Sequence, residues 1–453
     1  MHLDGPSRNG LASSERRDAI GVLVAGLNRL ARSDVLDRTG LRKPAERVVR
    51  EATRRGFGTM VAASRASRSF QRRGSSSAPG VRPASAPSSG TFDLTPTDDE
   101  QLLLEVAREL AADVLRPAAT EADDDAAAPD AVLKASLEIG LPVLGVPESL
   151  GGVAEERSAM AGTLVAEALA HGDLGLAVAT LAPGSVATAL ALWGTEEQQQ
   201  TYLPHFTGDD VPAAALALTE PSVLFDVLAP TTTAHREGDE LVLDGAKSLV
   251  PRGVDAELFV VGAELDGSPV LVVVPSGLPG LDVTEEPAMG VRAASLSRVT
   301  LTGVRVPTDA VLGATDGTTY AECVRLSRLA WCALAVGTAQ AVLDYVTPYV
   351  KERQAFGEPI AHRQSVAFMV ADMAIELQAM RLLTYRAASR AARGEDVSRD
   401  VGLARQQCAS RGMRIGLDGV QLLGGHGFVK EHPVERWYRD LRAIGVMEGG
   451  VLV

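Results

Sequence analysis

The sequence has few aromatic residues and almost no cysteine: Phe, Trp and Tyr make up 4% of its 453 residues, and three positions are cysteine. Cys323, Cys332 and Cys408 are too few for a disulfide framework and lack the spacing of a metal site. We therefore expect no metal and a reducing, cytoplasmic location. The longest apolar stretch, residues 329–343, is interrupted by polar residues, and we expect it to be too short to span a bilayer.

Nucleic-acid binding is not expected, because the net charge of −14 is concentrated in the main part of the chain. Residues 1–92 contain 17 Lys and Arg against 7 Asp and Glu, a balance of +10, which leaves −24 for the remainder. Two interpretations of the basic segment stay open. Its amphipathic pattern is typical of helices that pack on the main body, or of a surface for peripheral contact with an anionic membrane or an acidic partner.

Changes in composition and periodicity divide the chain into five segments. A basic helical extension, 1–73, is followed by a linker rich in Pro, Ser, Gly and Ala, 74–92. Residues 93–211 repeat apolar residues at helical spacing and predict an all-α N-terminal domain. Residues 212–315 alternate with a period of two and predict a middle β-barrel-like domain, and residues 316–453 predict a C-terminal four-helix bundle. The fold class is therefore α+β and multidomain.

Local patterns predict several details of these domains. Thr97 and Glu100 have the spacing of a capping box at the start of a helix, and Leu102 is expected to begin the buried stripe of that helix. The dipeptide Pro183-Gly184 is expected to break a later helix. In the β domain, Asp266-Gly267 predicts a short hairpin, and a phase slip at Gly303 predicts a bulge.

Short motifs follow one another in a fixed order through residues 94–450. They are PESLGG at 147–152, GTEEQ at 194–198, ALTEP at 217–221, MGVR at 289–292, RQAFG at 353–357, GGHGF at 424–428 and MEGG at 447–450. In this order and at this spacing they resemble the motifs of the acyl-CoA dehydrogenase family of flavoproteins. The resemblance covers about four-fifths of the chain.

The resemblance implies an enzyme of fatty acid metabolism that uses FAD to oxidise an acyl-CoA thioester to the trans-2-enoyl-CoA. Glu448 would take the α-proton while hydride passes from the β-carbon to the flavin N5. Such a proton is too weakly acidic for a carboxylate in water, so the site must bind the enolate oxygen and desolvate the base. Met447 and Gly449 beside Glu448 suit that task. The position of the base in other family members matches Ser327, which cannot act as one.

The resemblance also implies a set of binding residues. Thr219 would bond the isoalloxazine ring, and Arg328 and Gly449 would contact the substrate. The residues expected to reach the FAD of a neighbouring subunit are Arg353, Phe356, Gln364, Gln421 and Gly425. An ordinary structural role stays open for Thr219, Arg328 and Arg353. A homo- or hetero-oligomer is implied, a dimer or tetramer, with an electron-transferring flavoprotein as the electron acceptor.

Several departures from the family pattern affect the half-site that the chain offers to its own flavin. The glycine-rich turn after ALTEP becomes Ser222 to Asp226 and includes Phe225; Leu249 and Pro251 replace a stacking tryptophan and a flavin-bonding threonine; Gly450 replaces another threonine. Two alternatives therefore stay open. One is a catalytically impaired or half-site subunit of a hetero-oligomeric dehydrogenase, with a structural or regulatory role. The other is a different flavin reaction on the same fold, such as that of a monooxygenase or nitroalkane oxidase.

Overall fold

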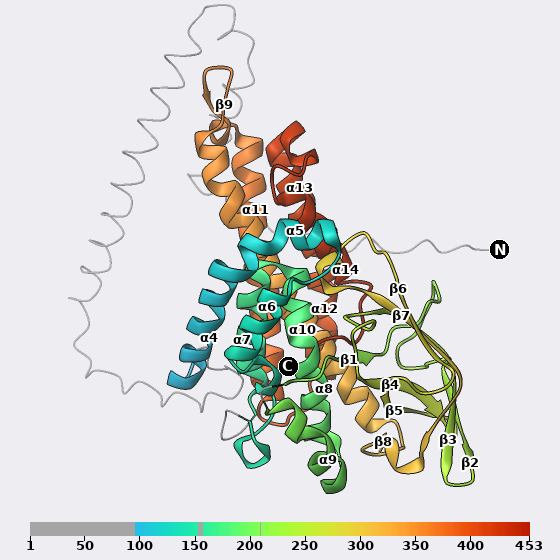
Figure 1. Cartoon of the computed structure of the whole chain (residues 1–453). Helices are drawn as coiled ribbons and strands as arrows, with labels where there is room; N and C mark the ends of the chain where they lie inside the picture. Colours follow the sequence, from blue (N-terminus) through green and yellow to red (C-terminus); the bar gives the residue numbers. More distant parts are fainter. Residues whose placement is uncertain (1–95, 153–156, 209) are drawn as a thin grey trace, which may run out of the picture. The chain divides into compact units, whose positions relative to one another are not determined.

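A computed structural model describes residues 96–453, apart from 153–156 and 209 (Figure 1). The basic extension and the linker predicted at 1–73 and 74–92 lie outside these residues. The described residues have a helical first part, a β middle part and a helical last part, so the predicted α+β fold class is confirmed.

Helices make up the N-terminal domain, and their bounds are α4 (Asp98–Leu110), α5 (Arg116–Asp125), α6 (Asp130–Glu138), α7 (Ala159–Gly172), α8 (Leu174–Trp193) and α9 (Glu196–Phe206). The predicted capping box is confirmed, because the Glu100 N–H donates to Thr97 Oγ1 at 3.2 Å and the Thr97 N–H donates to the Glu100 carboxylate at 3.0 Å. The prediction for Leu102 is wrong. Its side chain is 62% exposed, since α4 packs on α7 through Leu104 and the residues one turn on.

Pro183-Gly184 does not break a helix, contrary to expectation: α8 continues through both residues. The helix is buried along most of its length, and this packing outweighs the hydrogen bond that proline cannot form. Gly184 has a packing role instead. A Cβ at Gly184 would lie 2.9 Å from the Leu141 carbonyl oxygen, so glycine lets the two backbones approach.

Two described helices, α8 and the later α10 (Thr318–Glu352), are long and apolar enough to cross a membrane by length and composition. This corrects the expectation that no stretch is long enough. In their most apolar windows, 94% and 78% of the residues are buried against other parts of the protein, as in the core helices of a globular domain.

The middle domain consists of one eight-stranded sheet. Its strands are β1 (Ala214–Ala217), β2 (Thr233–Glu237), β3 (Glu240–Val250), β4 (Leu258–Leu265), β5 (Ser268–Pro275), β6 (Leu281–Glu285), β7 (Ser297–Pro307) and β8 (Val311–Leu312). The order is β6-β7-β3-β2-β4-β5-β8, and β1 pairs with β4 in parallel. The hairpin turn at Asp266-Gly267 is confirmed, because Leu265 pairs with Ser268. The bulge is confirmed too: Leu243 pairs with Val304 but Gly245 with Leu301, which leaves one extra residue on the Gly303 side.

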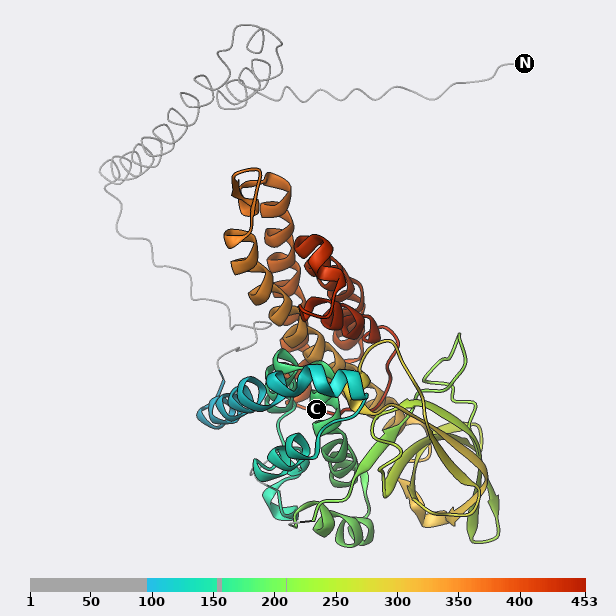
Figure 2. The same cartoon turned by 45° about the horizontal axis from the view of Figure 1, so that its top comes forward.

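The C-terminal domain is built on α10. The other elements are β9 (Gln354–Ala355), β10 (Glu358–Pro359), α11 (Gln364–Ala391), α12 (Ser398–Gln407), α13 (Met413–Leu423) and α14 (Val434–Ala443), with a π-helical turn, Cys408–Gly412, between α12 and α13. Helix α10 begins beside the sheet and ends at the β9–β10 hairpin (Figures 1 and 2). Trp331 on α10 and Trp437 on α14 are fully buried in the core that these helices share with α7 and α8.

A buried ion pair joins β3 to the segment that follows β1. Lys247 Nζ lies 2.7 Å from Glu220 Oε1, and both side chains are almost fully buried. Glu220 also accepts hydrogen bonds from Thr231 and Thr232. Burial raises the pKa of Glu220, but Lys247 and these donors outweigh it and bring the pKa to about 2. Lys247 has fewer partners, so burial lowers its pKa to about 8 despite Glu220. Both groups are charged at neutral pH.

A second buried carboxyl links α14 to the middle domain. Asp440 Oδ1 accepts a hydrogen bond from the Val291 N–H at 2.7 Å. Val291 has φ of +57°, a conformation that β-branched residues rarely adopt, so this bond helps to hold a strained backbone. Burial, together with the like charge of Asp173, raises the pKa of Asp440 to about 8.

We predict that Lys247→Met lowers the free energy of unfolding by about 3–5 kcal/mol, because it leaves the Glu220 carboxylate buried without its counter-ion. Chemical denaturation at neutral pH measures this change. Arg305→Met is the control: its pairs with Glu237 and Glu240 are exposed, and the stability should stay nearly unchanged. If the two substitutions lowered the free energy of unfolding equally, the buried carboxylate of Glu220 would not depend on Lys247 as its counter-ion.

We predict that Asp440→Asn changes how stability depends on pH. A carboxyl with a higher pKa in the folded chain than in the unfolded chain stabilises the fold at low pH, and this contribution is lost as the pH rises through about 8. The Asn variant should therefore gain stability relative to the natural chain, by on the order of 1 kcal/mol per pH unit between about pH 5 and pH 8. If the free energies of unfolding of the two proteins differed by the same amount at every pH, Asp440 would not retain its proton in the folded chain.

Candidate active site

Residues 447–453 return to the protein interior and pair with the sheet. Gly449 bridges Ala217 on β1, and the Gly450 N–H donates to the Leu216 carbonyl at 3.2 Å. Both glycines have positive φ, +75° and +84°. A Cβ at Gly449 would lie 2.9 Å from Leu218 Cγ, and one at Gly450 would lie 3.0 Å from Pro251 Cγ. The glycine pair is therefore required for this close approach.

The backbone of Glu448 is fixed by one hydroxyl group. Thr219 Oγ1 donates to the Glu448 carbonyl at 2.6 Å and accepts from the Glu448 N–H at 3.1 Å. Thr219 lies two residues after the end of β1 and is 5% exposed. Its hydroxyl, which the family resemblance assigns to the isoalloxazine ring, is thus engaged by the segment that carries the expected base. The same hydroxyl also occupies the Glu448 N–H.

Two arginines hold the Glu448 side chain. Arg328 on α10 forms a fork: Nε lies 2.9 Å from Oε2 and Nη2 lies 2.8 Å from Oε1. Arg405 on α12 donates through Nη2 to Oε1 at 2.8 Å and to the Met447 carbonyl at 3.1 Å. Glu448 is 9% exposed, so the carboxylate is shielded from bulk solvent. The carboxylate of Glu448 is therefore desolvated but paired with two arginines.

The charges around Glu448 do not balance, because two guanidinium groups face one carboxylate. Burial lowers the pKa of Arg328, but Glu448 outweighs it and the net shift is upward. Burial lowers the pKa of Arg405, and Glu448 offsets only part of the effect. Within the described residues, Arg405 Nη1 and Ser327 Oγ are buried without a hydrogen-bond partner. A surplus of positive charge and unused donors favours a ligand that carries or develops negative charge nearby.

Two neighbours fix the residues that follow Glu448. Trp331 Nε1 on α10 donates to the Gly449 carbonyl at 2.8 Å, and the Leu452 N–H donates to Ser185 Oγ on α8 at 2.9 Å. The carbonyl of Gly449, a predicted substrate contact, is thus bonded to protein. Elements from all three domains meet at this segment.

The residues expected to face a neighbouring subunit lie elsewhere. Arg353, Phe356 and Gln364 surround the β9–β10 hairpin, whereas Gln421 and Gly425 lie at the end of α13. Both views show these two ends side by side (Figures 1 and 2). All five residues are exposed, and Phe356 is 94% exposed. The structure therefore separates the predicted residues into a buried group at Glu448 and an exposed group at the far end of the bundle.

The exposed group fits one part of FAD, the expected cofactor. A Cβ built on Gly424 or Gly425 meets no atom within 4 Å, so a diphosphate can approach this backbone closely. Arg353, Gln364 and Gln421 supply donors for phosphate and ribose, and Phe356 supplies an apolar ring. A mostly apolar cavity of about 260 Å³ is lined by Leu249 and Met447 among others, but Glu448 itself does not line it.

Sequence reasoning missed Arg405, which contacts Glu448 directly. Arg405 follows the buried Ala404 on α12, and a single cation beside an apolar stripe gives no signal of its own, because most such residues face solvent. Trp331 was missed for a similar reason: a buried tryptophan on a core helix predicts packing, and its hydrogen bond to Gly449 depends on tertiary structure.

Three family models match consecutive parts of the chain. They are the acyl-CoA dehydrogenase N-terminal domain at residues 97–209, the middle domain at 215–304 and the C-terminal domain at 316–450. Together they span most of the described residues in the order that the fold shows.

Proteins with similar sequences and structures are also named as acyl-CoA dehydrogenases. The chain is 33% identical over 363 residues to cyclohex-1-ene-1-carbonyl-CoA dehydrogenase of Geobacter metallireducens, covering 78% of this chain and 95% of that protein. It is 33% identical over 361 residues to the mitochondrial short-chain specific acyl-CoA dehydrogenase of Bos taurus, covering 78% and 87%. The structure of butyryl-CoA dehydrogenase from Megasphaera elsdenii matches with a TM-score of 0.72 at 28% identity, covering 78% of this chain and 95% of that one.

We predict that Thr219→Val lowers the free energy of unfolding by about 1–3 kcal/mol, because it leaves the buried carbonyl and N–H of Glu448 without partners. Thr219→Ser keeps the hydroxyl and is the matched control. Thermal or chemical denaturation of the protein checks both. If valine were tolerated as well as serine, the hydroxyl would not be what fixes the Glu448 backbone.

Proposed function

Since this chain belongs to the acyl-CoA dehydrogenase family, we propose that it oxidises an acyl-CoA thioester to the trans-2-enoyl-CoA, with Glu448 as the base that takes the α-proton. The observation that carries the proposal is the position of Glu448. It is a buried carboxylate whose backbone and side chain are both fixed, at a point where the three domains meet. FAD is the cofactor of this family, and when bound it supplies the acceptor for the hydride that leaves the β-carbon.

The two arginines have different tasks in this proposal. The Arg328 fork sets the direction of the carboxylate, since two parallel hydrogen bonds fix its plane. Arg405 reaches only Oε1 and holds the adjacent Met447 carbonyl as well. To accept a proton through Oε1, Glu448 must give up at least one of these bonds. The arginines then provide positive charge next to the enolate that forms.

The proposed route begins when the thioester enters beside Met447 and Glu448 and excludes the remaining water. The carboxylate then removes the proton from the carbon next to the thioester carbonyl. We further propose an electron-transferring flavoprotein as the acceptor that reoxidises the enzyme.

A second candidate function follows from the separation of the two groups of residues. The Thr219 hydroxyl is engaged by Glu448 both as donor and as acceptor. Leucine at 249 and proline at 251 lack the aromatic ring and the hydroxyl expected near the flavin. The exposed group at Arg353 and Gln421 has no such loss. The chain could then serve as a subunit that completes the FAD site of a different partner chain.

We predict that Glu448→Gln lowers kcat by about 10²- to 10⁴-fold with an acyl-CoA panel, because the amide cannot take up the α-proton. The substitution keeps the size of the side chain and a hydrogen-bond acceptor for Arg328. Glu376→Gln is the control, since Glu376 is a part-buried carboxylate that also contacts an arginine. Activity that survives in the Glu448→Gln variant would exclude Glu448 as the base.

The content of FAD per chain decides between the two candidates. For the dehydrogenase we predict one FAD per chain in the protein purified alone, with affinity lowered at least about tenfold by Arg353→Ala, which removes a charge-assisted hydrogen bond. Arg399→Ala, at an exposed position on α12, is the control. Absorbance of the flavin and the mass of the oligomer are the measurements. A colourless protein that restores FAD binding only in a mixed oligomer would favour the half-site subunit.

A further inference from the structure

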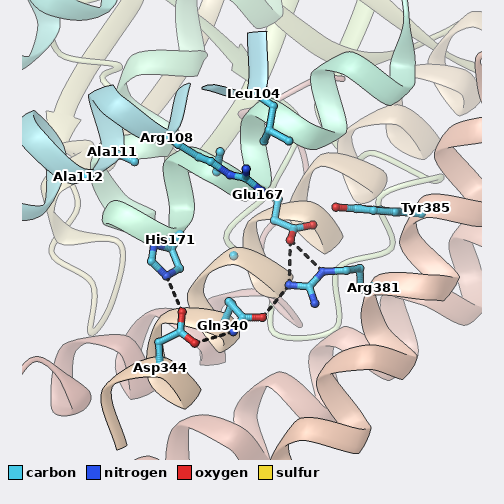
Figure 3. Close-up of a pocket in the computed structure, with 12 residues that line it drawn as sticks. Leu104, Arg108, Ala111, Ala112, Glu167, His171, Gln340, Asp344, Arg381 and Tyr385 are labelled. Atoms are coloured by element: carbon cyan, nitrogen blue, oxygen red, sulfur yellow. Dashed lines mark hydrogen bonds and ion pairs between the residues drawn. The ribbon is translucent and has the colours of Figure 1, made fainter. Parts of the chain in front are cut away.

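A cavity of about 590 Å³ lies between the N-terminal domain and the C-terminal bundle (Figure 3). Its walls come from α4 and the π-helical turn after it, Ala111–Leu115, and from α7, α10 and α11. Among the described residues, none of those that contact the Glu448 side chain lines it. The volume is within the range of about 300–1,000 Å³ that is typical of small-molecule sites. The cavity is therefore a site distinct from the one already described.

The acidic groups of this cavity are already paired with protein. Arg381 Nε donates to Glu167 Oε1 at 2.9 Å, and Arg381 Nη2 donates to Gln340 Oε1 at 2.9 Å. Asp344 accepts from the Gln340 amide at 2.8 Å and lies 3.0 Å from His171 Nε2. Figure 3 shows this chain of contacts along one wall. Glu167 Oε2 is buried and has no hydrogen-bond partner among the described residues.

Basic donors remain unused in the same cavity. Within the described part of the chain, Arg108 forms no hydrogen bond or ion pair, and Arg381 Nη1 forms no hydrogen bond. Arg108 reaches the cavity from α4, whereas Arg381 belongs to the opposite wall on α11 (Figure 3). Guanidinium groups with free N–H donors bind carboxylates well, because their planar geometry matches the two oxygens. The free N–H donors of the exposed Arg108 and of Arg381 therefore favour an anion, in a cavity that Glu167 and Asp344 also line.

Most of the remaining lining is apolar, apart from the hydroxyl of Tyr385. Leu104, Ala111 and Ala168 are buried, and Ala112 is exposed. A small inorganic anion would leave this surface uncovered, whereas an alkyl or aryl chain would remove it from water. The cavity is also much larger than an ion such as acetate requires.

We propose that this cavity binds an organic carboxylate with an apolar body, its carboxylate on Arg108 and its chain against Leu104 and the neighbouring alanines. Binding connects α4 and α7 to α10, the helix that carries Arg328, so the ligand would stabilise the contact between the N-terminal domain and the bundle. The proposal does not depend on the chemistry of Glu448.

The test is calorimetric titration of the purified protein with octanoate, using acetate and inorganic phosphate as comparison ligands. We expect one site per chain, with octanoate bound at least about tenfold more tightly than acetate because its chain is buried. Arg108→Gln should weaken octanoate at least about tenfold, through loss of a charge-assisted hydrogen bond. Ala112→Phe, which fills the edge of the cavity from an exposed position, should have a similar effect.

Matched controls separate this site from others. Arg399→Gln and Ala392→Phe change exposed residues outside the cavity and should bind octanoate like the natural protein. Glu448→Gln should also bind it normally, so a failure of the proposed dehydrogenase reaction would not affect the result. The proposal is overturned if octanoate shows no saturable binding up to its solubility limit, if phosphate binds as tightly, or if Arg108→Gln and Ala112→Phe bind octanoate unchanged.

Discussion

The hydrogen bonds between Thr219 and the backbone of Glu448 are the contact on which the described site depends. One hydroxyl joins the end of β1 to the segment after α14, 229 residues away in sequence. This contact brings the Glu448 carboxylate within reach of Arg328 and Arg405, which come from two other helices. A buried carboxylate is tolerated only where its charge is compensated, and here the compensation comes from parts of the chain that no local pattern connects.

The glycines at 449 and 450 make this contact possible. Their positive φ values and the short distances to Leu218 and Pro251 leave no room for a side chain. Other buried polar contacts hold the surrounding domains in a similar way, as in the ion pair of Glu220 with Lys247 and the hydrogen bond from the Val291 N–H to Asp440. The site thus lies in a region where several buried polar contacts must form together, which favours one arrangement of the three domains.

The features that could be predicted from the sequence are those set by a few consecutive residues or by the spacing of apolar residues. The capping box at Thr97, the turn at Asp266-Gly267 and the bulge at Gly303 are all confirmed, because each is set by the chemistry of a few consecutive residues. Predictions that depend on tertiary packing were less successful. Leu102 is exposed because the contact with α7 rotates the buried face of α4, and α8 passes through Pro183 because its surroundings bury it.

The candidate site was likewise predicted only in part. A resemblance of motifs was enough to select Glu448, Thr219 and Arg328, and the structure brings these three residues together. It could not reveal Arg405 or the bond from Trp331 to Gly449, since both depend on how α10 and α12 face the returning segment. The resemblance implied a desolvated carboxylate, and the structure shows a buried one between two cations that the sequence did not predict together. The charge around the base therefore depends on residues distant in sequence.

The central claim is that the buried Glu448 carboxylate removes the proton next to a thioester carbonyl. The most direct measurement is proton exchange: the FAD-loaded protein is incubated with an acyl-CoA in heavy water without an electron acceptor, and the α-proton signal is followed by NMR. The account predicts that the natural protein replaces this proton with deuterium and that Glu448→Gln does so no faster than buffer. Exchange at equal rates in both proteins would contradict it.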